Sequence, residues 1–337
     1  MKQNEFYKRF EIFLRNLKFE DKIFLVFDKD ADGVSSGVLT LHAFEKMGIE
    51  FSKIFPSFFK ESIPNMKKFS AGVVVDVPAS LQKKFLLTTR KKMLIIDHHP
   101  SDDLESENIS FINPRLIKKG IYQPTSYTAY NLFSDFVDLK KEKWIAIVGT
   151  VGDYAFSDVQ DLYKNEVDAR KKEEIWMTKY GRASTRLNAT IVVEGPLKAF
   201  NILSKCRSLD DFSKNGKVTE AYKKYSNEFW RINKEIKLEF YPNGLIFAGI
   251  KSKYRSMQSA VSSRLSTKYP KKLILIAAKE GKTYRISARM QSGKFDVGKL
   301  MAEFGGGGHR QAAACTVKGK EIDIFKERLI KIVGKMK

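Results

Sequence analysis

The chain has 337 residues, and its 61 Lys and Arg against 39 Asp and Glu give a formal net charge of +22. This length exceeds that of one typical domain and predicts two. The excess of positive charge favours an anionic partner such as nucleic acid, although a composition biased towards lysine would also produce it.

Several classes of protein are made improbable by features that the sequence lacks. The two cysteines, Cys206 and Cys315, belong to no CxxC or Cys/His cluster, which argues against a disulfide framework and a thiolate zinc site. No run of about 18 apolar residues predicts a membrane span, and the first residues lack the apolar stretch of a signal peptide. We therefore expect a cytoplasmic protein with no membrane partner.

The first half of the chain alternates short apolar runs with amphipathic stretches. Near the N-terminus, Phe6, Phe10 and Phe13 have helical spacing, which predicts a helix packed on the body of the protein. Buried strands are predicted by the short, branched apolar runs at residues 22–27, 72–75 and 92–96. A helical stretch at residues 34–47 separates the first two strands, which is the βαβ order of a mostly parallel sheet. Residues 144–156 are apolar and fit either a helix or a strand.

The second half begins with charged, polar sequence and then returns to alternation. Residues 206–243 have the pattern of one long polar helix, which we expect to connect two domains. Further strands are predicted at residues 244–250, 273–278, 283–288 and 312–317, and helices at 254–268, 296–303 and the C-terminus. The predicted fold class is α/β, with an N-terminal mostly parallel-sheet domain at residues 1–205, a helical linker at 206–243 and a smaller C-terminal α/β domain at 244–337.

Acidic residues follow three of the predicted strands. The first strand runs into Asp28, Asp30 and Asp32, the second into Asp76, and the third into the triplet Asp97-His98-His99. The carboxyl ends of parallel strands meet in one crevice, so these side chains are expected to converge. The strand period of two would also point Asp28, Asp30 and Asp32 in the same direction if strand geometry persists.

Carboxylates packed together repel one another unless they protonate or bind cations. A ligand set of carboxylate oxygen with imidazole nitrogen and no sulfur suits two divalent ions, Mn²⁺ first and Mg²⁺ second. A lone acid such as Asp76 is more often a turn or cap residue. The calcium-loop interpretation of residues 28–33 fails because its twelfth position is Leu39 rather than Glu.

Several motifs in one order resemble the DHH phosphoesterases, a family that includes RecJ-type exonucleases, oligoribonucleases and cyclic-dinucleotide phosphodiesterases. They are Asp28–Gly33, the Asp97-His98-His99 triplet, the segment 149–153 and the glycine run followed by His309. The resemblance extends from residue 28 to residue 315. It implies a metal-dependent phosphodiesterase that uses two Mn²⁺ ions, with Mg²⁺ as a possible substitute.

The resemblance also assigns roles in the first domain. It implies that the metal ligands are Asp28, Asp30, Asp32, Asp76, His98 and Asp153, with Asp76 bridging the two ions. Asp97 is expected to orient the His98 imidazole, as ligating histidines generally require. His99 is expected to contact the scissile phosphate or the leaving oxygen.

In the C-terminal domain the resemblance implies substrate-binding residues: Arg289, Gly306, Gly307, Gly308, His309 and Arg310. Glycines allow backbone N–H groups to approach a phosphate closely, and an arginine fork can hold phosphate oxygens. The alternatives are a flexible turn for the glycine run and a solvated strand residue for Arg289. Asn113-Pro114-Arg115 also resembles a family segment, but the sequence after it departs from the RecJ pattern.

The sequence indicates the type of reaction more clearly than it indicates the substrate. The positive charge and the all-acid first motif favour a RecJ-like exonuclease acting on single-stranded nucleic acid. The alternatives are a degrader of short oligonucleotides, a cyclic-dinucleotide phosphodiesterase and a non-catalytic DHH-fold scaffold of a replication complex. A helicase or another replisome protein is a possible partner.

Overall fold

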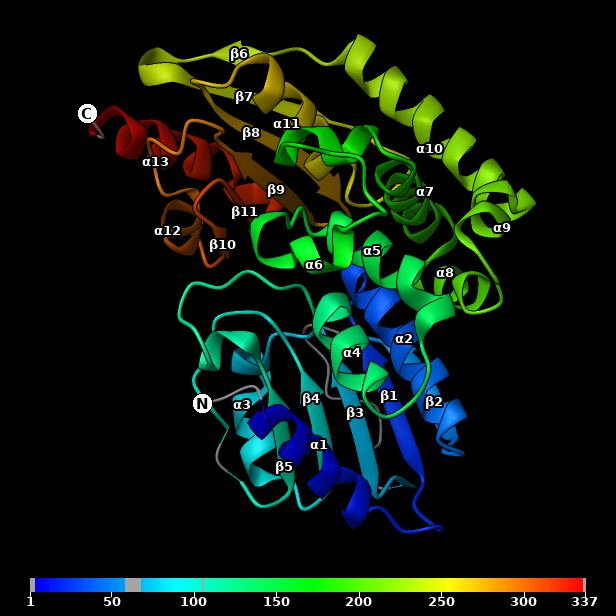
Figure 1. Ribbon diagram of the computed structural model, residues 1–337. Coiled ribbons are helices and arrows are strands. Elements are labelled where there is room, and N and C mark those ends of the chain that lie inside the picture. The colour runs from blue at the N-terminus through cyan, green and yellow to red at the C-terminus, as the bar shows by residue number, and fades with distance from the viewer. Residues whose placement is uncertain (1–3, 58–67, 105, 336–337) are drawn as a thin grey trace. The chain divides into compact units, whose positions relative to one another are not determined.

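The computed structural model describes residues 4–57, 68–104 and 106–335. The chain divides into two compact units, Met1–Tyr222 and Lys223–Lys337, which we call the first and second units (Figure 1). The boundary lies inside one helix, α10 (Gly216–Glu235). The functional domain boundaries proposed from the sequence remain a prediction.

The first unit is built on a five-stranded parallel sheet in the order β2-β1-β3-β4-β5. The three strands predicted from sequence are its centre: β1 (Ile23–Phe27), β3 (Ala71–Val75) and β4 (Lys92–Ile96). The edge strands β2 (Phe51–Pro56) and β5 (Ile109–Ile112) were not predicted. The prediction of an α/β fold with a mostly parallel sheet is confirmed.

The central strands read as continuous apolar runs because both faces of the sheet are covered. Leu25 and Phe27 of β1 join one hydrophobic core with Phe10 of α1 (Asn4–Asn16), while Phe24 and Val26 join a second core on the opposite face. The N-terminal helix packs on the body of the protein, as its phenylalanine spacing predicts. The other helices of this unit are α2 (Ala31–Lys46), α3 (Ala79–Thr88), α4 (Thr125–Ser134), α5 (Lys143–Gly152), α6 (Gln160–Tyr163), α7 (Lys179–Glu194), α8 (Pro196–Leu203) and α9 (Leu209–Lys214).

The ambiguous run at residues 144–156 is helical as far as Gly152, where α5 ends, and leaves the helix at Asp153. The prediction of one long helix over 206–243 is wrong. Ser208 starts the short helix α9 by accepting a hydrogen bond from the Asp211 N–H, and α9 ends at Lys214. The regular helix α10 covers only Gly216–Glu235, and β6 (Glu239–Phe240) follows it.

The second unit contains a mixed six-stranded sheet in the order β10-β11-β9-β8-β7-β6. Strands β7 (Leu245–Ile250) and β8 (Leu273–Glu280) are parallel, and the other neighbouring pairs are antiparallel. The remaining elements are β9 (Thr283–Arg289), β10 (Gly307–His309), β11 (Ala312–Lys318), α11 (Met257–Lys268), α12 (Val297–Ala302) and α13 (Ile322–Lys335). In the part of the chain that the structure describes, no helix has the length and apolar character needed to cross a bilayer.

Candidate metal centre

The C-terminal ends of three neighbouring strands place acidic residues side by side. Phe27 of β1 is level with Val75 of β3, which is level with Ile96 of β4. The residues that follow them are Asp28, Asp76 and Asp97. The sheet therefore brings the acids to one edge, as expected for parallel strands.

Asp30 and Asp32 reach this edge through a helix rather than an extended strand. Strand β1 ends at Phe27, and Asp30 is the N-cap of α2, its Oδ1 accepting a hydrogen bond of 2.9 Å from the Gly33 N–H. Asp32 lies in the first turn of α2. The strand period of two was expected to align these acids only if strand geometry persisted, and it does not, because β1 ends at Phe27 and α2 begins at Ala31.

Glycine is required at position 33 by the tightness of that turn. A Cβ added at Gly33 would lie 2.5 Å from the Asp28 carbonyl oxygen, a contact with backbone that a flexible side chain cannot relieve. The close approach of α2 to the end of β1 therefore fixes Asp28 and Asp30 relative to one another.

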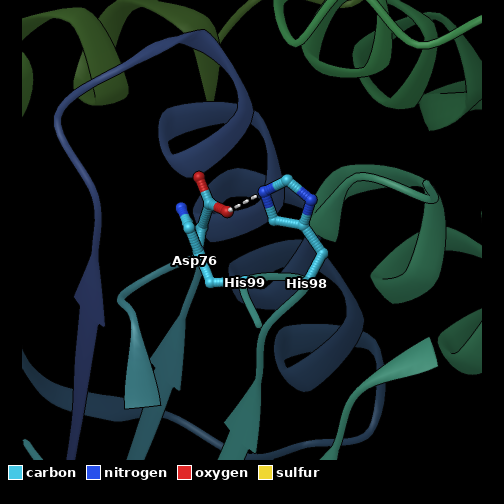
Figure 2. Close-up of side chains that lie close together, drawn as sticks. All are labelled: Asp76, His98 and His99. Atoms are coloured by element: carbon cyan, nitrogen blue, oxygen red, sulfur yellow. Dashed lines mark ion pairs between the residues drawn. The ribbon is translucent and has the colours of Figure 1, made fainter. Parts of the chain in front are cut away.

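Asp76 lies at the centre of the acidic cluster and is only 1% exposed. Its backbone adopts a left-handed conformation, with φ of 62°, which is uncommon for a residue other than glycine and is typical of functional sites. The Asp76 N–H donates to the Ile96 carbonyl oxygen, and one carboxylate oxygen accepts from the Thr125 hydroxyl at 2.8 Å. The same oxygen lies 3.4 Å from His98 Nε2 (Figure 2).

The side chains at this edge form three groups that could each hold a metal ion. Within each group, the candidate ligand atoms lie within 4.8 Å of one another. The groups are Asp28–Asp30–Asp76, Asp32–His98–Asp153 and Asp76–His98–His99. All six metal ligands implied by the resemblance are present in them. Asp76 and His98 each belong to two groups, which is the arrangement expected when two ions lie side by side.

The carboxylates at this edge repel one another in a buried setting. Burial, followed by the charge of Asp30, raises the pKa of Asp28 to about 6. Burial, with the charges of Asp153 and Asp30, raises the pKa of Asp32 to about 8. The pKa of Asp76 is raised well above its ordinary value, by burial first and then by Asp32. Hard or borderline divalent cations would remove this repulsion, so the donor set fits them.

The Asp97 carboxylate holds the His99 imidazole, whereas the sequence predicted that it orients the His98 imidazole. Asp97 Oδ1 lies 2.7 Å from His99 Nδ1 and also accepts the backbone N–H groups of His98 and His99. Asp97 Oδ2 accepts from the Ala79 N–H. Strand β4 ends at Ile96, and the backbone of the triplet then turns so that two of its own N–H groups point at the Asp97 carboxylate.

Asn113 and Arg115 hold the backbone of the histidine pair. Asn113 is the N-cap of a short 3-10 helix (Pro114–Leu116), and its side-chain amide donates to the His99 carbonyl oxygen at 2.9 Å. Arg115 Nε donates to the His98 carbonyl oxygen at 2.7 Å. The sequence singled out this segment without a clear role, and the structure gives it a positioning role.

A further layer of polar residues surrounds the ligands, and no pattern in the sequence had indicated it. The Tyr122 hydroxyl donates to Asp153 Oδ2 at 2.8 Å, and its ring lies 5.6 Å from that of His98. Both oxygens of Asp32 accept backbone N–H groups, from Thr125 and Ser126 at the start of α4. A proline followed by Thr and Ser signals a helix start, but nothing in the sequence links that start to Asp32.

In the second unit, Arg289 ends strand β9 and is largely enclosed. Its Nη2 donates to the Ser259 hydroxyl at 3.1 Å, and burial lowers its pKa. Its Nε is buried and has no hydrogen-bond partner among the described residues. The alternative of a solvated strand residue is therefore wrong, and contact with a phosphate stays a prediction.

Gly305 lies in a turn, whereas Gly307 and Gly308 belong to strand β10 (Gly307–His309). Strand β10 pairs with β11, and a Cβ on Gly306 would lie 2.1 Å from the Ala314 carbonyl oxygen. Gly308 has a φ of 144°, and its Cβ would meet Ala312 backbone. Gly307 faces open space, and Arg310 donates to the Gly293 carbonyl oxygen. The side chain of His309 lies outside what the structure describes, and substrate contact by these residues stays a prediction.

Two family models match the chain in consecutive order. The DHH family N-terminal domain matches residues 22–150, and the DHHA1 domain matches residues 245–335. The chain belongs to the DHH phosphoesterase family. This DHH protein carries the DHHA1 domain in its second unit.

Solved structures share the fold of this DHH protein at low sequence identity. RecJ of Thermus thermophilus in complex with Mn²⁺ is 14% identical, with a TM-score of 0.76 over 100% of this chain and 56% of that one. An exonuclease RecJ bound to manganese is 15% identical, with a TM-score of 0.67 over 100% and 96%. CDC45 from Entamoeba histolytica is 11% identical, with a TM-score of 0.61 over 98% and 99%.

One curated protein matches over a short segment. The A-adding tRNA nucleotidyltransferase of Aquifex aeolicus is 44% identical over 63 residues, which is 19% of this chain and 7% of that protein. The DHH protein thus spans little of this relative and about half of the Thermus RecJ chain.

Proposed function

We propose that this DHH protein is a two-metal-ion phosphodiesterase that hydrolyses single-stranded nucleic acid as a RecJ-like exonuclease. The observation that carries the proposal is the position of Asp76, which is buried and belongs to two of the three ligand groups. Buried acids whose pKa values are raised by mutual repulsion are poorly explained as structural elements.

The donor set divides naturally between two ions. Asp28, Asp30 and Asp76 would hold one ion, and Asp32, His98 and Asp153 the other. When bound, such ions act as Lewis acids towards the phosphate and stabilise the charge that develops on it. Mn²⁺ is the first choice because the set includes an imidazole, and Mg²⁺ the second.

His99 is suited to contact the substrate directly. Its side chain is 29% exposed, while that of the proposed ligand His98 is 4% exposed. The Asp97 carboxylate accepts the hydrogen bond from Nδ1 and so fixes the ring. Nε2 is then the nitrogen left to contact the scissile phosphate or the leaving oxygen.

A nucleic-acid substrate is supported by the net charge of +22, because phosphate contacts dominate affinity for such polymers. Arg289, with its buried Nε, would hold a further phosphate. The second candidate function is a non-catalytic scaffold, and the fold similarity to CDC45 is the observation that suggests it. The complete ligand set favours the enzyme.

The test is hydrolysis of end-labelled strands of about 2, 5 and 20 nucleotides, as DNA and as RNA, with Mn²⁺ or with EDTA. We expect cleavage that requires the metal and is lost in Asp76→Asn. A preference for the longest strand supports the exonuclease, and a preference for the shortest supports an oligonucleotide degrader. Absence of cleavage at every length, with intact metal binding, would favour the scaffold.

A further inference from the structure

In the second unit, aromatic and cationic side chains of α10, α11 and β6 lie beside one another in a row. We call this row the aromatic strip and define it as Trp230, Arg264, Lys268, Tyr269 and Phe240. Trp230 and Phe240 are 52% and 62% exposed, and they are two of the three exposed Phe or Trp side chains in the described part of the chain. Single exposed aromatic side chains are common, but rings that lie beside cations form a surface suited to a ligand.

Cation–π and ring contacts join neighbouring members of the strip, and helix α11 connects Arg264 to Lys268. The Arg264 guanidinium lies 5.3 Å from the centre of the Trp230 ring, and it also donates to Asn233 Oδ1 at 2.8 Å. Lys268 lies one helical turn after Arg264 on α11. Its ammonium is 5.2 Å from the Tyr269 ring, which meets the Phe240 ring edge-on at 6.1 Å.

The strip is separate from the surroundings of Arg289. Helix α11 turns Ser259, Ser262 and Ser266 towards β9 and the residues after it, where they contact Arg289, Ser287 and Gln291. At 100° per residue, Arg264 and Lys268 lie on the opposite side of the helix from those serines. Arg264 and Lys268 therefore face away from Arg289.

The positive charge of the sequence around α11 indicates what kind of ligand binds to the aromatic strip. Residues 251–279, which include α11, contain eight Lys or Arg and no Asp or Glu. A basic surface with interspersed aromatic rings is the composition that binds unpaired nucleotides, because bases stack on the rings and cations hold the phosphates. A duplex offers its bases no such access.

We propose that the aromatic strip is a second binding site for single-stranded nucleic acid, which holds nucleotides other than those at the metal centre. This inference rests on the proposed function in so far as the substrate is nucleic acid. It predicts that long strands bind more tightly than short ones for a reason outside the metal centre.

The experiment measures binding of a fluorescein-labelled 20-nucleotide oligothymidylate by anisotropy, in EDTA, with the full chain. We expect Trp230→Ala to weaken binding about tenfold. The double variant Arg264→Ala with Lys268→Ala should lower the slope of log affinity against log salt by about 1.4, which corresponds to two phosphates of a single strand. Phe19→Ala and the pair Lys320→Ala with Lys331→Ala are matched exposed controls outside the strip, and they should bind as the unaltered protein does.

Two failures can be told apart. If the unaltered protein cleaves a trinucleotide with Mn²⁺ but the strip variants bind the 20-nucleotide strand as tightly as it does, the strip proposal is wrong and an acidic protein becomes the alternative occupant. If the unaltered protein cleaves no strand, the proposed function fails, while weaker binding by the strip variants alone would still support the strip. Thermal unfolding midpoints confirm that each variant is folded.

Discussion

Arg115 Nε donates a hydrogen bond of 2.7 Å to the carbonyl oxygen of His98, seventeen residues earlier in the chain. The guanidinium thus holds the backbone of a proposed metal ligand. Partners of this kind orient a ligand, and their loss typically costs 10-fold to 100-fold in metal affinity.

We therefore expect Arg115→Met to weaken Mn²⁺ binding by roughly 10-fold to 100-fold, as measured by titration calorimetry. Arg90→Met is the matched control, since Arg90 is exposed in a loop of the same unit. Unchanged Mn²⁺ affinity in Arg115→Met would contradict a positioning role.

Asp97→Asn separates two accounts of the Asp97 carboxylate. Because Asp97 holds His99 rather than the His98 imidazole, the variant should lower kcat by about 100-fold with little loss of metal affinity. The account drawn from the sequence would instead predict weaker Mn²⁺ binding. Asp102→Asn is the control, since its side chain is 93% exposed.

Gly33→Ala should disturb both stability and the metal centre. The added methyl group would press on the Asp28 backbone, and overpacking of this kind costs about 1–3 kcal/mol. We expect a lower midpoint of thermal unfolding and weaker Mn²⁺ binding. Gly216→Ala, where the methyl group meets open space, should change neither. A wild-type midpoint in Gly33→Ala would count against the tight turn.

The metal-free protein should lose stability as pH rises. Unfolded aspartates have a pKa of about 3.9, whereas Asp28 and Asp32 in the folded chain have values of about 6 and about 8. A raised folded pKa means that the folded state binds protons more tightly, so stability is highest below pH 4 for these groups and falls between pH 4 and 8.

The corresponding measurement is the unfolding midpoint in EDTA and in saturating Mn²⁺ across that range. The stabilisation by Mn²⁺ should grow with pH, because the ligands must be deprotonated. Asp32→Asn removes one of these carboxylates and should flatten the decline in EDTA. The proposed repulsion between the buried carboxylates is refuted if the unfolding midpoint in EDTA rises steadily from pH 4 to 8 and changes in the same way in Asp32→Asn.

The sequence predicted the parts of the fold that depend on continuous burial. Strands β1, β3 and β4 are covered on both faces, so their apolar runs are unmistakable, whereas the edge strand β2 is mostly half-exposed or exposed and has no such pattern. The convergence of Asp28, Asp76 and the histidine pair followed from parallel-strand topology.

The remaining features of the site depend on tertiary contacts that no local pattern records. Tyr122 reaches Asp153 and Thr125 reaches Asp76 across 31 and 49 residues of sequence. The role of Asp30 could have been read, because an aspartate before a helix is a common N-cap. The interpretation of it as a strand residue overlooked that signal.

The left-handed backbone of Asp76 limits which amino acids can replace it without strain. Asparagine shares the tolerance of aspartate for this conformation, and the two side chains have the same shape. Asp76→Asn would thus give an inactive copy of the protein with an undistorted main chain. Such a copy is a suitable trap for capturing uncut substrate in a crystal.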